Sequence, residues 1–198
     1  ARPVRRKGPV VIAADLMQEA PAILTGVAAA LCLTAAPIFR ARRTILLVQL
    51  AAALCFAAHY FCLGIAVAGA VNILNGFQIG AALFAGRSAA MNRLGYALIG
   101  LMVLVGFWFW QGPVSGLSVM ATVLIALARM QPSQLGLRVL LLAGGCFWAG
   151  HDLAVGAWIA LSADIGALLM GLVALSSLLV RVSIEWRPST PAQAAAAA

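Results

Sequence analysis

Polar side chains embedded in long apolar stretches are the residues of this chain best suited to chemistry. Asp164 lies early in the last apolar run, and Asn72 lies at a similar depth in an earlier run. An unpaired carboxylate inside hydrocarbon is costly, so Asp164 should be protonated, paired or placed in a hydrated cavity. Because such acids commonly mark substrate or proton pathways, we predict that Asp164 and Asn72 bind substrate. Hydrogen bonding to a neighbouring helix is the alternative role.

Two more amides follow Asn72 on the same helix face. Asn75 and Gln78 come at steps of three residues, which places the three side chains within about a third of the helix circumference. A polar stripe of this kind must face protein or water rather than lipid. We predict Asn75 as a further substrate-binding residue, and we assign Gln78 and Gln49 to contacts between helices.

His59 and His151 each close an apolar run. Imidazole changes charge near neutral pH and can relay protons, so we predict both histidines as substrate-binding residues; the alternative is a half-solvated helix end. Asp152, beside His151, is expected to be solvated near the membrane surface. These groups could bind a metal, but no local ligand spacing favours one, and we predict neither metal nor cofactor. Zinc-protease, serine-hydrolase and P-loop motifs are missing from the sequence, which predicts a protein that is not an enzyme.

The elements that must position these residues are membrane-spanning helices. Apolar residues make up 64% of the chain and charged residues 9%, whereas about a quarter of residues are charged in soluble domains. We therefore predict the lipid bilayer as a partner and exclude nucleic acid, despite a net charge of +8. Runs long enough to span cover about residues 22–39, 44–63, 65–86, 93–111, 113–131, 137–154 and 157–181. The thiols within these runs, expected to be buried and not disulfide-bonded, are Cys32, Cys55, Cys62 and Cys146.

Positive charge is distributed unevenly among the connections. Gly64, residues 111–113 and residues 155–156 form short connections without charge. The alternate connections and the exit from the last run carry Arg40, Arg42, Arg43, Arg87, Arg93, Arg129, Arg138, Arg181 and Arg187. The positive-inside rule thus predicts a cytoplasmic C-terminus and an N-terminus outside. The basic N-terminal tail opposes this orientation, but it lies about 15 residues ahead of the first span, at the limit of the rule's reach.

The chain contains an internal repeat with an offset of 92 residues: Phe56, His59, Gly64 and Asn72 correspond to Trp148, His151, Gly156 and Asp164. Two units of three helices, joined by one extra helix, have the same orientation in the membrane. We therefore predict an all-α membrane protein with seven transmembrane helices, arranged as two parallel triple-helix bundles joined by a linker helix. The predicted segments are a basic tail (1–21), the first bundle (22–86), the linker helix (87–112), the second bundle (113–182) and a disordered tail (183–198).

This architecture resembles that of the SWEET sugar transporters, in which an asparagine on the third helix of each bundle faces the substrate. Asn72 and Asp164 hold those places. At the residue level, the chain resembles the YgjV-type bacterial inner-membrane proteins over about residues 22–182. The segments that carry this resemblance are His59-Tyr60-Phe61-Cys62-Leu63-Gly64, Cys146-Phe147-Trp148-Ala149-Gly150-His151 and Arg40-Ala41-Arg42-Arg43. The family often has an arginine where this chain has Gln78. The resemblance implies a multi-span inner-membrane protein and no particular activity.

Two functions fit these features. The first is a carrier for a small polar solute, with its site between the two bundles and access that alternates as the bundles rock. The second is a non-transporting accessory or scaffold subunit of a larger membrane complex. Either function predicts a location in the bacterial inner membrane, and the protein could form a homo-oligomer or join a larger assembly.

Overall fold

Uninterrupted runs of apolar and small residues favour helices, because a helix satisfies its own backbone polar groups inside a bilayer. The structure is a computed structural model that describes residues 9–64, 66–156 and 158–185. Over these residues the chain forms seven α-helices and no strand, which confirms the predicted all-α class and the number of helices. The elements are α1 (Pro9–Ala35), η1 (Ala36–Ile38), α2 (Arg42–Cys62), α3 (Ala66–Phe84), α4 (Ala89–Trp108), α5 (Pro113–Met130), α6 (Gln134–Val155) and α7 (Trp158–Glu185).

Glycine, serine and proline set the ends of several helices. Gly64 and Gly156 follow α2 and α6 with φ of 74° and 71°, a left-handed conformation that glycine adopts without a Cβ clash. Ser88 and Ser133 cap the starts of α4 and α6, and each accepts a hydrogen bond from the backbone N–H three residues later. Pro113 stands in the first turn of α5, where no N–H is needed.

The two ends of the chain differ from the prediction. α1 begins at Pro9 rather than near residue 22, so part of the predicted basic tail is helical. The apolar pattern does not reveal this extension, because the segment ahead of residue 22 is too short to span a bilayer. α7 continues to Glu185, slightly beyond the predicted second bundle. Residues 1–8, which contain the basic residues of the N-terminal tail, and residues 186–198 of the predicted disordered tail (183–198) lie outside the described residues, whereas residues 183–185 are helical.

Most of the predicted spans are long and apolar enough to cross a bilayer. Among the described residues, five segments meet this description: Ala20–Ile38, Arg42–Cys62, Ala89–Trp108, Pro113–Met130 and Leu161–Arg181. α3 contributes a shorter apolar segment, Ala68–Phe84. α6 falls outside this group, and it carries Arg138 and Asp152.

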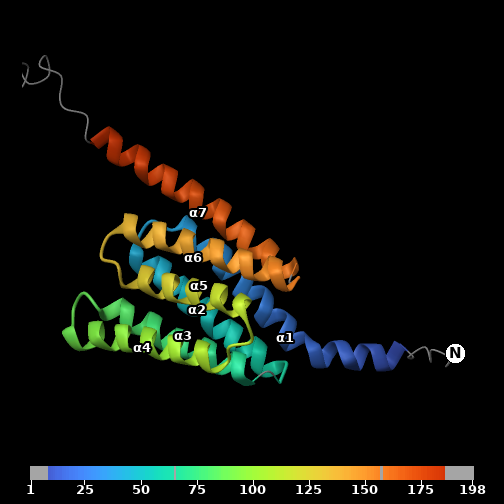
Figure 1. Cartoon of the computed structure of the whole chain (residues 1–198). Helices are drawn as coiled ribbons and strands as arrows, with labels where there is room; N and C mark the ends of the chain where they lie inside the picture. The colour runs from blue at the N-terminus through green and yellow to red at the C-terminus, as the bar shows by residue number, and fades with distance from the viewer. Residues whose placement is uncertain (1–8, 65, 157, 186–198) are drawn as a thin grey trace, which may run out of the picture.

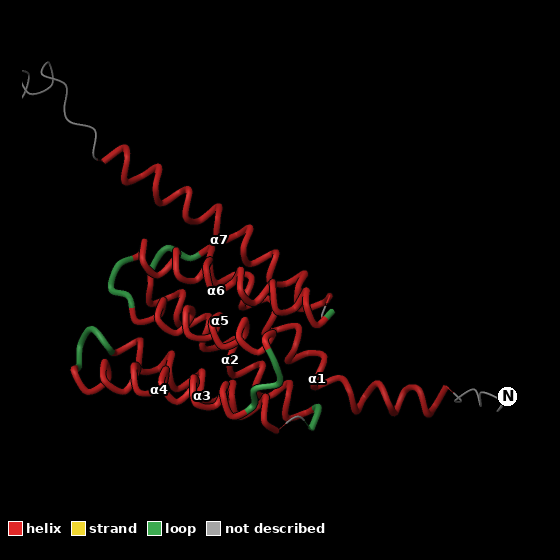
Figure 2. The backbone as a smooth tube through the Cα atoms, in the orientation of Figure 1, coloured by secondary structure: helices red, strands yellow, loops and turns green. Residues whose placement is uncertain are grey.

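The helices contact one another in a cyclic order. α2 lies between α1 and α3, and α6 lies between α5 and α7. Further contacts join α1 to α7 and α3 to α5, which closes a ring of six helices, while α4 packs against α3 and α5 (Figure 1). The loop after α3 and the loop after α5 lie at the same end of the molecule (Figure 2). At opposite ends, the start of α1 and the end of α7 extend beyond the other helices (Figure 1).

Small residues dominate the packed core. The largest buried cluster joins α2, α3, α4 and α5 through Leu46, Ala53, Ile79, Ala82, Ile99, Met102, Ala126 and Met130. Alanine allows close approach of helices, which is how helices associate in lipid. Many large apolar side chains lie on the outer surface instead, where a bilayer would cover them. The cysteines are free, but Cys62 and Cys146 are exposed rather than buried as predicted.

The Gly144→Ala variant should weaken the packing of α5 against α6. A Cβ atom at position 144 would lie 2.6 Å from Cγ1 of Ile125 and 3.1 Å from the backbone oxygen of Ala121. Backbone cannot move aside cheaply, so we expect the free energy of unfolding, measured by denaturant titration in detergent, to fall by about 1–3 kcal/mol.

Gly100→Ala is the matched control, because a Cβ atom at that position on α4 would meet no atom within 4 Å. This variant should be neutral or more stable by up to about 1 kcal/mol, since alanine favours a helix over glycine. Equal unfolding free energies for the two variants would contradict the close contact of α5 with α6.

Candidate functional site

A cavity of about 590 Å³ lies inside the ring of helices. Small-molecule sites commonly have volumes of about 300–1,000 Å³ and mainly apolar walls with a few convergent polar groups. All seven helices contribute to the wall of this cavity. Its polar and charged side chains are Gln49, Tyr60, Asn72, Asn75, Ser115, Ser118, Thr122, Arg129, Arg138, Asp152 and Asp164.

Arg129 lines one end of the cavity from the last turn of α5, and only 6% of the residue is exposed. Its Nε donates to Oε1 of Gln49 at 2.9 Å. Its Nη1 donates to Oδ1 of Asn75 at 2.5 Å and to Oε1 of Gln78 at 3.3 Å. Gln78 is fully buried and donates from Nε2 to the backbone oxygen of Ala126 at 3.0 Å. The guanidinium therefore links α5 to α2 and α3, and we call this region the arginine end.

The positive charge at the arginine end has no carboxylate partner among the described side chains. Arg42 donates to backbone oxygens near the ends of α3 and α5. Arg138 donates to the backbone oxygens of Pro37 and Phe39. The C-terminus of α5 favours a cation by about 0.3–1 kcal/mol. Removing a guanidinium from water costs several times more, so the neutral acceptors and the helix end compensate the buried charge only in part.

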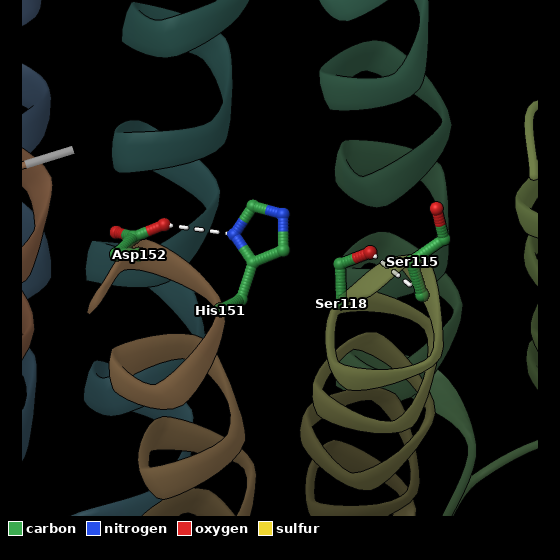
Figure 3. Close-up of polar contacts among 4 residues, drawn as sticks. All are labelled: Ser115, Ser118, His151 and Asp152. Carbon is green, nitrogen blue, oxygen red and sulfur yellow. Dashed lines mark hydrogen bonds and ion pairs between the residues drawn. The ribbon is translucent and has the colours of Figure 1, made fainter. Parts of the chain in front are cut away.

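The opposite end of the cavity is acidic. Asp152 on α6 is buried and pairs with Nδ1 of His151 at 2.9 Å, and Asp164 on α7 interacts electrostatically with both residues. His151 and Asp152 lie at the same level of the bundle as Ser115 and Ser118, which belong to the first turns of α5 (Figure 3). Since a helix rises 1.5 Å per residue, Ser115 and Arg129 are roughly 20 Å apart along α5. The cavity thus extends between an arginine end and an acidic end.

Three of the five predicted substrate-binding residues line this cavity. Asn72 and Asn75 do so from α3, and Asp164 does so from α7. All three are half-buried. Asn72 also donates from Nδ2 to the backbone oxygen of Ala68, one turn earlier, at 3.0 Å. The structure therefore brings Asn72 and Asp164, which the predicted repeat pairs, to one cavity.

The two histidines do not line the cavity. Nδ1 of His59 donates to the backbone oxygen of Ala22 at 2.6 Å, which links α2 to α1. His151 contacts the edge of Trp148 and the carboxylate of Asp152, and both of these neighbours line the cavity. His59 is thus engaged between helices, whereas His151 can influence the cavity only through its neighbours.

Three charged residues of the site, Arg129, Arg138 and Asp152, were not assigned to it from the sequence. Arg129 and Arg138 line the cavity although the charge pattern groups them with the connections predicted to be cytoplasmic, and Asp152 is buried rather than solvated as expected. The signal for Arg129 is its place inside an apolar run, ahead of Pro132. Gln49 and Gln78 do contact another helix, as predicted: both accept from the guanidinium of Arg129, and Gln78 also donates to the backbone oxygen of Ala126. The resembling family often has an arginine at the position of Gln78. In this chain the guanidinium beside that position belongs to Arg129 of α5.

The helical fold and the polar side chains of the cavity identify the protein as a helical membrane protein with several spans and an internal cavity. Comparison with known families narrows that class, because residues 20–181 match the Imp-YgjV family, described as bacterial inner membrane protein. The chain therefore belongs to the Imp-YgjV family of bacterial inner membrane proteins, and its environment is the lipid bilayer. No curated protein and no solved structure matches the chain.

Proposed function

We propose that this protein is a carrier for a small polar solute, which binds in the cavity between the two halves of the chain. The observation that carries the proposal is that Asn72 and Asp164, one from each half, line the same cavity of about 590 Å³. A purely structural bundle would fill its interior at the close packing typical of protein cores. A cavity with polar side chains in its wall instead offers a solute groups that replace its hydration during passage.

The lining of the cavity supports two parallel repeats. Many lining residues fall into pairs separated by the repeat offset of 92 residues, so corresponding helices turn corresponding sides to the cavity. These pairs are Leu33 and Ile125, Pro37 and Arg129, Gln49 and Leu141, Ala53 and Gly145, Phe56 and Trp148, Tyr60 and Asp152, Asn72 and Asp164, and Asn75 and Ala167. With this offset α1 corresponds to α5 and α3 corresponds to α7. The contact of α1 with α7 therefore corresponds to the contact of α5 with α3. Rocking of two such units about the cavity would alternate its access.

In this proposal the arginine end faces the cytoplasm and the acidic end faces the outside. The loops after α3 and α5 lie at one end of the molecule (Figure 2); Arg87 belongs to the first of these loops, and Arg129 and Arg138 flank the second in sequence. The positive-inside rule then places the N-terminus outside and the C-terminus inside. A solute entering from outside would meet Asp152 and Asp164 first and Arg129 last.

Ligand-dependent stability followed by uptake tests the proposal. The purified full chain is screened in mild detergent against amino acids, organic acids and sugars for solutes that raise its melting temperature. Each stabilising solute is then supplied in labelled form to proteoliposomes that contain the protein and to empty liposomes. We expect at least one stabilising solute to accumulate only in the proteoliposomes, with an initial rate that saturates.

The accessory-subunit hypothesis predicts a different pair of results. No solute would accumulate above the level in empty liposomes, and a membrane partner would copurify in a fixed ratio after mild solubilisation. That combination would contradict the carrier proposal.

A further inference from the structure

We infer that the arginine end of the cavity is an oxyanion subsite in which Arg129 is the donor, so that the solute bears a carboxylate or phosphate group. This inference rests on the proposed carrier function and adds to it the chemical class of the solute. It follows from the free hydrogen-bonding capacity of Arg129 and from the charges that surround it.

Arg129 has one terminal nitrogen to spare. Nε and Nη1 are occupied by Gln49, Asn75 and Gln78, whereas Nη2 has no hydrogen-bond partner among the described residues. Nη2 is also not enclosed, because the fully buried polar atoms without a partner are Oε1 of Gln134 and Nε of Arg138. Since Arg129 lines the cavity, Nη2 is the donor that a bound solute can reach.

The surroundings of this donor lack negative charge. Buried charges in proteins are normally paired, yet the three side-chain acceptors of Arg129 are all neutral amides. Arg138 lines the same cavity and adds a second guanidinium without a described carboxylate partner. The described carboxylates of the lining, Asp152 and Asp164, belong to the acidic end. An oxyanion would therefore supply the counter-charge that the protein does not.

The side chains around Arg129 also hold it in a geometry suited to an oxyanion. The guanidinium donates three hydrogen bonds to side chains of two other helices, and these bonds fix its plane. A guanidinium held in this way keeps the N–H groups of Nη2 at a fixed position, from which they can donate charge-assisted hydrogen bonds to a carboxylate or phosphate oxygen. A role in joining helices alone would not account for the free Nη2 donor at the cavity.

Anion titration of the full chain in uncharged detergent tests this inference. The probes are succinate, inorganic phosphate and, as a cation, choline, all at constant ionic strength. Binding is followed by tryptophan fluorescence, since Trp148 lines the cavity, and by melting temperature. We expect saturable binding of succinate or phosphate and none of choline. Arg129→Lys keeps the charge but removes the guanidinium whose Nη2 is free while Nε and Nη1 are held, and it should weaken anion binding at least about tenfold.

Two further variants separate a specific site from general attraction and from misfolding. Arg93→Gln removes an exposed arginine of α4 that does not line the cavity, and it should bind the anions as wild type does. Asn75→Asp places a carboxylate beside the guanidinium while preserving side-chain shape. It should fold as stably as wild type without ligand, yet bind the anions at least about tenfold more weakly.

The inference would be overturned if wild type bound neither anion, or if Arg129→Lys and Asn75→Asp bound them as tightly as wild type. Displacement of both probes by phosphatidylglycerol micelles would support the oxyanion subsite and identify a lipid headgroup as its source. Because this titration measures binding alone, its failure would leave a carrier for uncharged solutes intact. Anion binding without any uptake would instead contradict the carrier proposal.

Discussion

The Arg129→Met variant should have a free energy of unfolding about 2–4 kcal/mol lower than wild type. Methionine removes three hydrogen bonds that join α5 to α2 and α3, and it leaves the acceptors of Gln49, Asn75 and Gln78 without their donor. Relief of the buried charge and access of cavity water offset part of this loss. Equilibrium unfolding in mixed detergent micelles, followed by circular dichroism, measures the difference.

Arg93→Met is the matched control for this loss of a positive charge. Arg93 is exposed near the start of α4, and a surface substitution there should change the unfolding free energy by no more than about 0.5 kcal/mol. Arg129→Lys should be intermediate, because one ammonium group cannot reach all three acceptors. If Arg129→Met were as stable as Arg93→Met, the three hydrogen bonds would not hold the arginine end together.

Replacing Asp164 with asparagine should lower the initial rate of solute uptake at least about tenfold. The substitution keeps the shape of the side chain but removes the negative charge at the acidic end, where Asp152 and His151 interact with it. A hydrogen bond that involves a charged group contributes about 1.5–3 kcal/mol, which corresponds to roughly tenfold to a hundredfold in affinity. Uptake of the identified solute into proteoliposomes at matched protein density measures the effect.

Ser176→Ala provides a control on the same helix. Ser176 does not line the cavity, and its hydroxyl donates to the backbone oxygen of Val173 within α7. This variant should transport at the wild-type rate. Unchanged uptake in Asp164→Asn would remove Asp164 from the site, whereas a folding defect would show as a lower melting temperature in that variant.

The seven helices could be predicted because lipid demands long apolar runs whose backbone groups bond to one another. The side that each helix turns inward was harder to predict. Tyr60 lines the cavity, whereas His59, its neighbour in sequence, bonds to α1. The predicted repeat pairs Asn72 with Asp164, but a match between sequence positions does not specify which way a side chain points. The same match led to the prediction of a substrate-binding role for His59 and His151, which do not line the cavity.

Arg129 shows the other limit of sequence reasoning. Its role depends on Gln49, Asn75 and Gln78, which are more than 50 residues away and reach it only through the packing of α5 against other helices. Local periodicity carries no information about such contacts. Counted by charge alone, Arg129 is one of many arginines that set orientation. Its burial is what distinguishes it from exposed residues such as Arg93.

Chemical labelling of positions 72 and 164 tests most directly whether these residues face one hydrated path. In a chain whose native cysteines are replaced by alanine, Asn72→Cys, Asp164→Cys and Leu169→Cys are each treated with a charged, membrane-impermeant thiol reagent. Such reagents attack the thiolate, which forms only in contact with water. Leu169 is 59% exposed on the outer face of α7 and does not line the cavity. The account predicts rapid labelling at 72 and 164 and very slow labelling at 169; equally slow labelling at all three would contradict it.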